Sequence, residues 1–150
     1  MIISATRAPK IHRPSRSQQP GIVLGLRYER RFIKTLRETV GSKFQVEYQP
    51  WFFYVDGEGN RSACAPDILL HDDELCITYV IEVKYTWVPA ALVKLKTLYC
   101  PVVSKALGCD TEPLVVVKRL TPEAPSPRLG LLMAGTSPLF QWLESNSVVL

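Results

Sequence analysis

Two short stretches of the sequence carry residue types that could do chemistry: Pro66-Asp67, and further along the chain Glu82-Val83-Lys84. Both lie in segments with the apolar, β-branched composition of strands, in which side chains alternate between the two faces. Glu82 and Lys84 therefore share one face of their strand, whereas Val83 points to the other. Two opposite charges on one face of an otherwise apolar strand are costly to bury without a task.

These are the side chains that a divalent metal ion needs if it is to activate water beside a phosphodiester. Magnesium takes oxygen ligands, one or two of them carboxylates and the rest from water and phosphate. Asp67 and Glu82 could supply the carboxylates, and the backbone carbonyl of Val83 could add a third oxygen. Lys84 could orient or deprotonate the attacking water, or stabilise the charge that builds up on phosphorus. Glu29 could reach the same site from an earlier helix as an outer ligand or base.

Less chemical interpretations of the same residues stay open from the sequence alone. Asp67 could cap a turn, and Glu82 and Lys84 could form a surface ion pair on a sheet edge. Glu29 could pair with neighbouring basic residues on the surface of its helix. The turn at residues 71–74, His-Asp-Asp-Glu, is interpreted as a polar connection between strands rather than a metal cluster.

Apolar periodicity predicts the elements that must position these side chains. A first helix is expected over residues 25–40, where apolar residues recur at helical spacing. A second helix is expected over 89–107, with a kink at Pro101, followed by a strand over 114–120 and a short helix over 139–144. The strands expected between the two long helices cover residues 44–55 with a break at Pro50, 61–65, 67–70 and 75–85.

The predicted fold class is α/β (α+β), with a mixed β-sheet flanked by helices in the order α-β-β-β-α-β. The chain has 150 residues, of which 47% are hydrophobic and 21% charged, so one domain with a single core is expected. We place this domain at residues 23–150, with its core at about 23–120 and a C-terminal extension at 121–150. Residues 1–22 are basic and rich in proline, which is typical of a flexible arm.

Charge and cysteine content narrow the class of partner. A net charge of +4 permits a nucleic-acid partner without requiring one. The four cysteines lack the spacing of a zinc site, and no small-molecule cofactor is indicated. No segment has the apolar length of a signal peptide or a membrane span, so a cytoplasmic protein with no membrane partner is expected.

The acid-bearing first helix, Ala65-Pro66-Asp67 and Ile81-Glu82-Val83-Lys84 together resemble the PD-(D/E)XK nuclease superfamily, which has the restriction-endonuclease-like fold. Residues 44–67 are similar to small phage Holliday-junction resolvases and transposon-end endonucleases, in which a hairpin also delivers the strand beginning Pro-Asp. The resemblance covers about residues 23–120. It implies that Asp67 and Glu82 are metal ligands, that Lys84 is the catalytic lysine and that Glu29 is the first-helix acid.

The activity that this resemblance implies is magnesium-dependent hydrolysis of DNA phosphodiester bonds, with Mn²⁺ able to substitute for Mg²⁺. The first interpretation is an endonuclease, such as a branched-DNA (Holliday-junction) resolvase or a phage-type DNA-processing nuclease acting in a bacterial host. One alternative is an exonuclease of the same superfamily, although the second helix lacks the Gln of the Gln-x-x-x-Tyr pattern found in some exonuclease branches. The other is a non-catalytic module for nucleic-acid binding or assembly.

Several residues outside the acidic cluster are candidates for binding DNA, because basic and aromatic side chains bind phosphates and bases. They are Lys94, Lys96 and Tyr99 on the second helix, Trp87 after the lysine strand, and Arg13 and Arg16 in the basic arm. Loop packing for Trp87 and simple solvation for the basic residues are the alternatives. A homodimer is also expected, since two strand cuts are most easily paired by a two-fold axis. Its predicted interface is the apolar C-terminal segment, at residues 129–133, 139, 140, 142 and 148–150.

Overall fold

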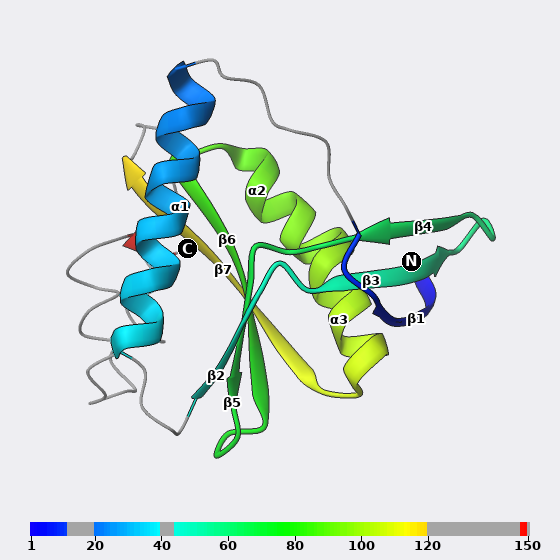
Figure 1. The fold of residues 1–150 in the computed structure, drawn as a ribbon. Helices are drawn as coiled ribbons and strands as arrows, with labels where there is room; N and C mark the ends of the chain where they lie inside the picture. Colours follow the sequence, from blue (N-terminus) through cyan, green and yellow to red (C-terminus); the bar gives the residue numbers. More distant parts are fainter. Residues whose placement is uncertain (12–19, 40–43, 120–147, 150) are drawn as a thin grey trace.

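A computed structural model describes residues 1–11, 20–39, 44–119 and 148–149 as a mixed α+β structure with two sheets (Figure 1). The strands are β1 (Ile2–Ala8), β2 (Phe44–Tyr48), β3 (Trp51–Asp56), β4 (Arg61–Cys64), β5 (Ile68–Asp72), β6 (Ile77–Thr86), β7 (Asp110–Arg119) and β8 (Val148–Val149). The helices are α1 (Pro20–Thr39), α2 (Pro89–Lys94) and α3 (Cys100–Leu107), with a π-helical segment η1 (Leu95–Tyr99) joining α2 to α3.

The larger sheet has five strands in the order β2-β5-β6-β7-β8. β2, β5 and β6 are antiparallel neighbours, whereas β6 and β7 run parallel because the helical connection α2-η1-α3 carries the chain back across the sheet. β6 therefore has a strand on each side, and Glu82 and Lys84 lie on an interior strand. This position rules out the sheet-edge alternative for the pair.

Apolar side chains of β6 alternate between the two faces of the sheet and fill two cores. Tyr79 and Ile81 pack with Leu36 of α1 on one face. Val80 packs with Val102 of α3 on the opposite face. Figure 1 shows α1 and the α2-η1-α3 connection on opposite sides of β6 and β7. Buried on both faces, the central strands have the near-continuous apolar sequence that such strands require.

At the position of the kink predicted for Pro101, the helix is interrupted by the π-helical segment η1, which immediately precedes α3. Pro101 lies in the first turn of α3, where its missing N–H would have bonded to a carbonyl one turn back. The Cys100 N–H instead bonds to the Leu95 carbonyl five residues back, which widens the helix over η1. Gly108 ends α3 with φ 63°, the left-handed conformation that favours glycine at a helix end.

The second sheet has three strands in the order β1-β3-β4 and packs against α3. The prediction of a flexible arm over residues 1–22 is wrong for residues 2–8, which form β1 and pair along β3. Within β1 only Ile2 is deeply buried, so the strand lacks the regular alternation of buried and exposed side chains. The guanidinium of Arg7 fixes the strand further, donating to both carboxylate oxygens of Glu47 at 2.7 and 2.9 Å.

Other boundaries differ from the sequence predictions by a few residues. α1 begins at Pro20 rather than at residue 25, and Pro50 separates β2 from β3 as expected. β8 pairs with β7 at the edge of the larger sheet, and a role of residues 148–149 in a dimer interface stays a prediction. The predicted helix at 139–144 and the rest of that interface lie outside the described residues.

We expect Phe52→Ala to lower the free energy of unfolding by about 3–5 kcal/mol, because the ring is fully buried between the second sheet and α3 and its loss leaves a cavity. Phe53→Ala is the matched control, since the adjacent side chain on β3 is 47% exposed. It should change stability by about 0.5 kcal/mol or less. Urea denaturation measures both, and equal losses would contradict the described packing of β3.

Candidate active site

Glu29, Asp67, Glu82 and Lys84 lie around one pocket of about 500 Å³, so the structure brings together the four predicted catalytic residues. Glu29 comes from the middle of α1, and Asp67 immediately precedes β5. Glu82 and Lys84 lie on β6, on the face that carries Val80 and is covered by the helical connection. Val83, the fifth predicted residue, also lines the pocket, while its side chain packs in the core beneath α1.

Asp67 is anchored by a hydrogen bond to the middle of β6. Its Oδ2 accepts the Val83 N–H at 2.8 Å, and both groups are buried. Pairing between β5 and β6 ends at Ile68 and Ile81, so the Asp67 carboxylate satisfies a β6 amide beyond the last paired residues of β5. Asp67 Oδ2 is therefore held beside the residue that separates Glu82 from Lys84.

Glu82 is only 3% exposed, and its two oxygens have different surroundings. Oε1 lies 3.0 Å from the Lys84 Nζ. Oε2 is fully buried and has no hydrogen-bond partner among the described residues. A buried carboxylate oxygen without a donor is strongly unfavourable unless a further positive group binds there.

Glu29 is 5% exposed and is held by the segment between β2 and β3, which rules out the helix-surface alternative for it. Its Oε1 accepts the Tyr48 hydroxyl at 3.0 Å and the Gln49 side-chain amide at 3.4 Å. The Gln49 backbone N–H also donates to the Asp67 carbonyl at 2.8 Å, so one residue connects both acids. Gln49 has φ 48°, a conformation that non-glycine residues rarely adopt away from functional sites.

The charges of the pocket are unbalanced among the residues described. Burial, together with the charges of Glu82 and Glu29, raises the pKa of Asp67 to about 7. Burial lowers the pKa of Lys84, but the carboxylates of Glu82, Asp67 and Glu29 outweigh this effect, and the net shift is upward. Lys84 is thus kept as an ammonium ion, which favours charge stabilisation over proton abstraction as its role.

A divalent cation fits this donor set. Three carboxylates share the pocket with the ammonium groups of Lys84 and Lys94, and Glu82 Oε2 has no donor within the described part of the chain. No three His, Cys, Asp or Glu side chains in residues 1–11, 20–39, 44–119 or 148–149 cluster tightly enough to ligate one ion by themselves. A magnesium ion would therefore take Asp67 and Glu82, with its other oxygens from water, substrate or the Val83 carbonyl.

The predicted DNA-binding residues divide into four groups. Lys94 and Tyr99 line the pocket, with the Lys94 Nζ 4.7 Å from the centre of the Tyr99 ring. These residues are five apart, and the widened turn of η1 brings such residues toward the same side of the helix. Lys96 is exposed and does not line the pocket.

The prediction that Trp87 contacts DNA is wrong, because its side chain is 5% exposed and packs in the core with Leu95 and Val115. The chain turns from the end of β6 onto the face covered by the helices, and the indole follows it inward. Arg13 and Arg16 lie outside the described residues.

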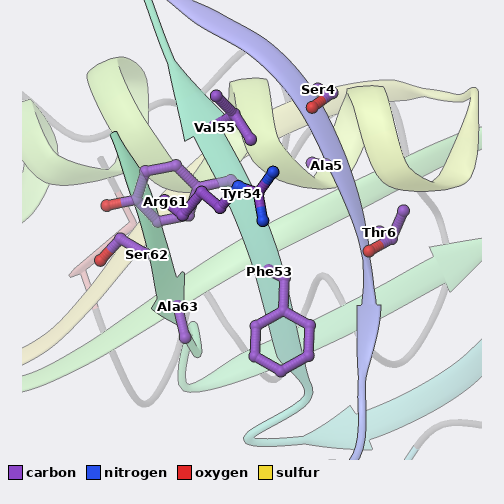
Figure 2. A pocket seen from close by; sticks show the side chains of 9 residues that line it. All are labelled: Ser4, Ala5, Thr6, Phe53, Tyr54, Val55, Arg61, Ser62 and Ala63. Carbon is purple, nitrogen blue, oxygen red and sulfur yellow. The ribbon is translucent and has the colours of Figure 1, made fainter. Parts of the chain in front are cut away.

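Sequence reasoning missed Tyr48 and Gln49, which position Glu29. The only available signal was a polar pair directly before Pro50 at the end of a predicted strand. A second hollow, of about 530 Å³, lies on the outer face of the three-stranded sheet (Figure 2). Its lining contains no carboxylate, imidazole or thiol, so the acidic pocket is the stronger candidate for catalysis.

No family model, curated protein or solved structure matches the chain. Among the described residues, no helix has the length and apolar character needed to cross a bilayer.

The stability of the metal-free protein should fall as pH rises from about 4 to about 7. Asp67 has a folded-state pKa near 7, above the value of about 3.9 in an unfolded chain, so the folded protein binds more protons in this window. Asp67→Asn keeps an acceptor for the Val83 N–H but removes the titration. In EDTA, urea denaturation at pH 5 and pH 8 should therefore show a smaller loss for this variant than for the wild type.

The control for this experiment is Asp73→Asn, which changes an exposed carboxylate in the turn between β5 and β6. It should keep the wild-type difference between pH 5 and pH 8. If Asp67→Asn also kept that difference, the raised pKa of Asp67 would be wrong.

Proposed function

We propose that this protein is a metal-dependent endonuclease that hydrolyses phosphodiester bonds in DNA. The observation that carries the proposal is the buried cluster of Glu29, Asp67 and Glu82 around Lys84, with one Glu82 oxygen lacking a donor in the described chain. The mixed α+β structure, with a central sheet between α1 and the helical connection, is compatible with this proposal at the level of fold class.

In this mechanism Asp67 and Glu82 hold Mg²⁺, which Mn²⁺ can replace. When bound, the metal supplies charge neutralisation at the scissile phosphate and lowers the pKa of water. The Val83 N–H keeps the Asp67 carboxylate in place, so little reorganisation is needed as the substrate binds. Protonated Lys84 orients the attacking water through its N–H groups and stabilises the negative charge that develops on the phosphate oxygens.

Glu29 acts from the opposite wall of the pocket. Tyr48 and Gln49 restrict its carboxylate to one orientation. There it can accept a proton from water or bind the hydration shell of the metal. Because Gln49 also bonds to the Asp67 backbone, a shift of the β2–β3 connection would displace two of the acids together.

DNA is the proposed substrate because lysine side chains line the pocket beside its acidic residues. Lys94 lies over Tyr99 at the wall of the pocket, where a cation can bind a phosphate next to the scissile one. Within the nuclease class we propose a branched-DNA or phage-type DNA-processing enzyme that works as a homodimer. Two copies related by a two-fold axis would place one such pocket on each strand.

We expect magnesium-dependent cleavage by the wild-type protein and a loss of at least about 100-fold in Lys84→Ala, which lacks the cation beside the reacting phosphate. Asp67→Ala should lose activity similarly. Lys96→Ala is the matched control, because this lysine lies on η1 but outside the pocket and should keep near-wild-type activity. The assay measures products from supercoiled circular, linear, single-stranded and four-way-junction DNA.

The form of DNA that is cut distinguishes the endonuclease from the exonuclease and from a non-catalytic module. Cutting of circular DNA supports an endonuclease, and activity that requires a free end supports an exonuclease. DNA binding without cleavage in Mg²⁺ or Mn²⁺ would support a non-catalytic module. Cleavage that survives both Lys84→Ala and Asp67→Ala would reject the assigned site.

Magnesium itself should stabilise the fold, because an ion that binds only the folded state shifts the unfolding equilibrium by mass action. Its removal with EDTA should lower the Tm of the wild type. Glu82→Gln should abolish this dependence by removing one ligand charge, whereas Asp73→Asn should retain it. Differential scanning calorimetry over a series of Mg²⁺ concentrations provides the measurement, and an unchanged wild-type Tm up to millimolar Mg²⁺ would count against the site.

A further inference from the structure

A second polar cluster lies at the opposite end of β5 and β6 from the acidic pocket. The Nε2 of His71 lies 2.5 Å from Glu47 Oε2, and its Nδ1 lies 2.8 Å from the Thr78 hydroxyl. The Thr78 hydroxyl in turn accepts the Cys109 thiol, with 3.4 Å between sulfur and oxygen. Arg7 donates to both carboxylate oxygens of Glu47, including the Oε2 beside His71. The proposed nuclease mechanism uses none of these residues.

Each hydrogen bond in this cluster has a defined direction. The hydrogen bond from Arg7 lowers the pKa of Glu47, and the bond to His71 adds to the effect. Ionised Glu47 can only accept, so the His71 Nε2 carries a proton and, in the neutral ring, the Nδ1 accepts the Thr78 hydroxyl. A continuous path therefore runs from the Cys109 thiol through Thr78 to a basic ring nitrogen. Transfer along it would leave a thiolate at Cys109 and an imidazolium beside Glu47.

A second thiol, that of Cys76, lines the same hollow as Cys109 and donates to the Asp73 carbonyl, with 3.7 Å between sulfur and oxygen. The parallel pairing of β6 with β7 begins at Ile77 and Asp110, and the two cysteines immediately precede those residues. Neighbouring strands are about 4.8 Å apart, which is within the range of α-carbon separations that a disulfide spans. Both cysteines line one open hollow of about 510 Å³, and both are free thiols.

The surroundings of the two thiols suit reaction with a dissolved molecule. Cys76 is exposed and Cys109 partly exposed, whereas Cys64 and Cys100 are buried. Cys76 has φ 54° in a turn whose amides at Glu74 and Leu75 donate to Asp72 Oδ1. The charged groups around the hollow are Arg7, Glu47, His71, Asp72 and Asp73.

We propose that Cys109 and Cys76 form a reactive dithiol that reduces low-molecular-weight disulfides such as oxidised glutathione and closes to an intramolecular disulfide. The Cys109 thiolate attacks one sulfur of the disulfide, forming a mixed disulfide and releasing one glutathione thiolate. The Cys76 thiolate then attacks the Cys109 sulfur, forming the Cys76–Cys109 bond and releasing the second glutathione thiolate. The two protons lost by the cysteines end on the two glutathione molecules, so two protein thiols are oxidised and one disulfide is reduced.

This reaction is independent of DNA cleavage, and its test does not require nuclease activity. The native 150-residue chain is incubated with oxidised glutathione at pH 7.5, quenched with acid, alkylated and analysed by intact mass and peptide mapping. We expect the wild type to lose two alkylatable thiols and to yield a peptide pair joined through Cys76 and Cys109. Cys76→Ser should stop at a glutathione adduct on Cys109, and Cys109→Ser should form no internal disulfide. Cys64 and Cys100 serve as internal controls that stay alkylatable.

The role of the hydrogen-bonded path is tested by His71→Gln, in which an amide replaces the ring and cannot take up the proton. The rate of Cys109 alkylation by iodoacetamide in the native protein should fall about tenfold or more. Reaction of Cys76 should stay unchanged, which separates loss of the relay from general unfolding. Equal rates in the wild type and in His71→Gln, or oxidation that leaves Cys76 and Cys109 both reduced, would overturn the proposal.

Discussion

The hydrogen bond from the Val83 N–H to the Asp67 carboxylate is the interaction on which the acidic pocket depends. It joins the start of β5 to the middle of β6 at the residue between Glu82 and Lys84. The same bond stabilises the ionised form of Asp67, while burial and the charges of Glu82 and Glu29 favour its neutral form and prevail. A hydrogen bond from a backbone amide therefore holds Asp67 in a buried position in which its charged form is disfavoured. Such opposition is typical of sites in which a ligand supplies the missing charge.

β6 links two polar clusters that differ in how far their own residues satisfy them. At one end, Glu82 Oε2 has no donor among the described residues, and three carboxylates share the pocket with two lysines. At the other end, Glu47 accepts from Arg7 and His71, and each nitrogen of the His71 ring has a partner. Apolar residues such as Val80 and Ile81 separate the clusters along the strand. The first cluster thus keeps a carboxylate oxygen without a donor in the described chain, whereas the polar side chains of the second bond to one another.

Strand alternation was enough to predict the central part of the candidate site. Placing Glu82 and Lys84 on one face of a buried strand needs only the period of two and the apolar residues around them. The helix that carries Glu29 was equally visible from its apolar spacing. The pairing of residues 2–8 with β3 was not, because the partner strand is distant in the sequence and the residues that follow are basic and rich in proline. The position of Trp87 depends on the direction in which the chain leaves β6, which local sequence does not determine.

Contacts that depend on how distant segments align could not be predicted from the sequence either. Gln49 contacts Glu29 because α1 packs across the end of β2, and its positive φ runs against the usual preference of a residue before proline. Cys76 and Cys109 line one hollow because β6 and β7 run parallel, an alignment that the helical crossover sets. That crossover also contains η1, the widened segment that brings Lys94 over Tyr99. The α2-η1-α3 connection thus determines both the position of Lys94 at the acidic pocket and the placement of Cys76 and Cys109 at one hollow. A change in its length would alter both ends of β6 together.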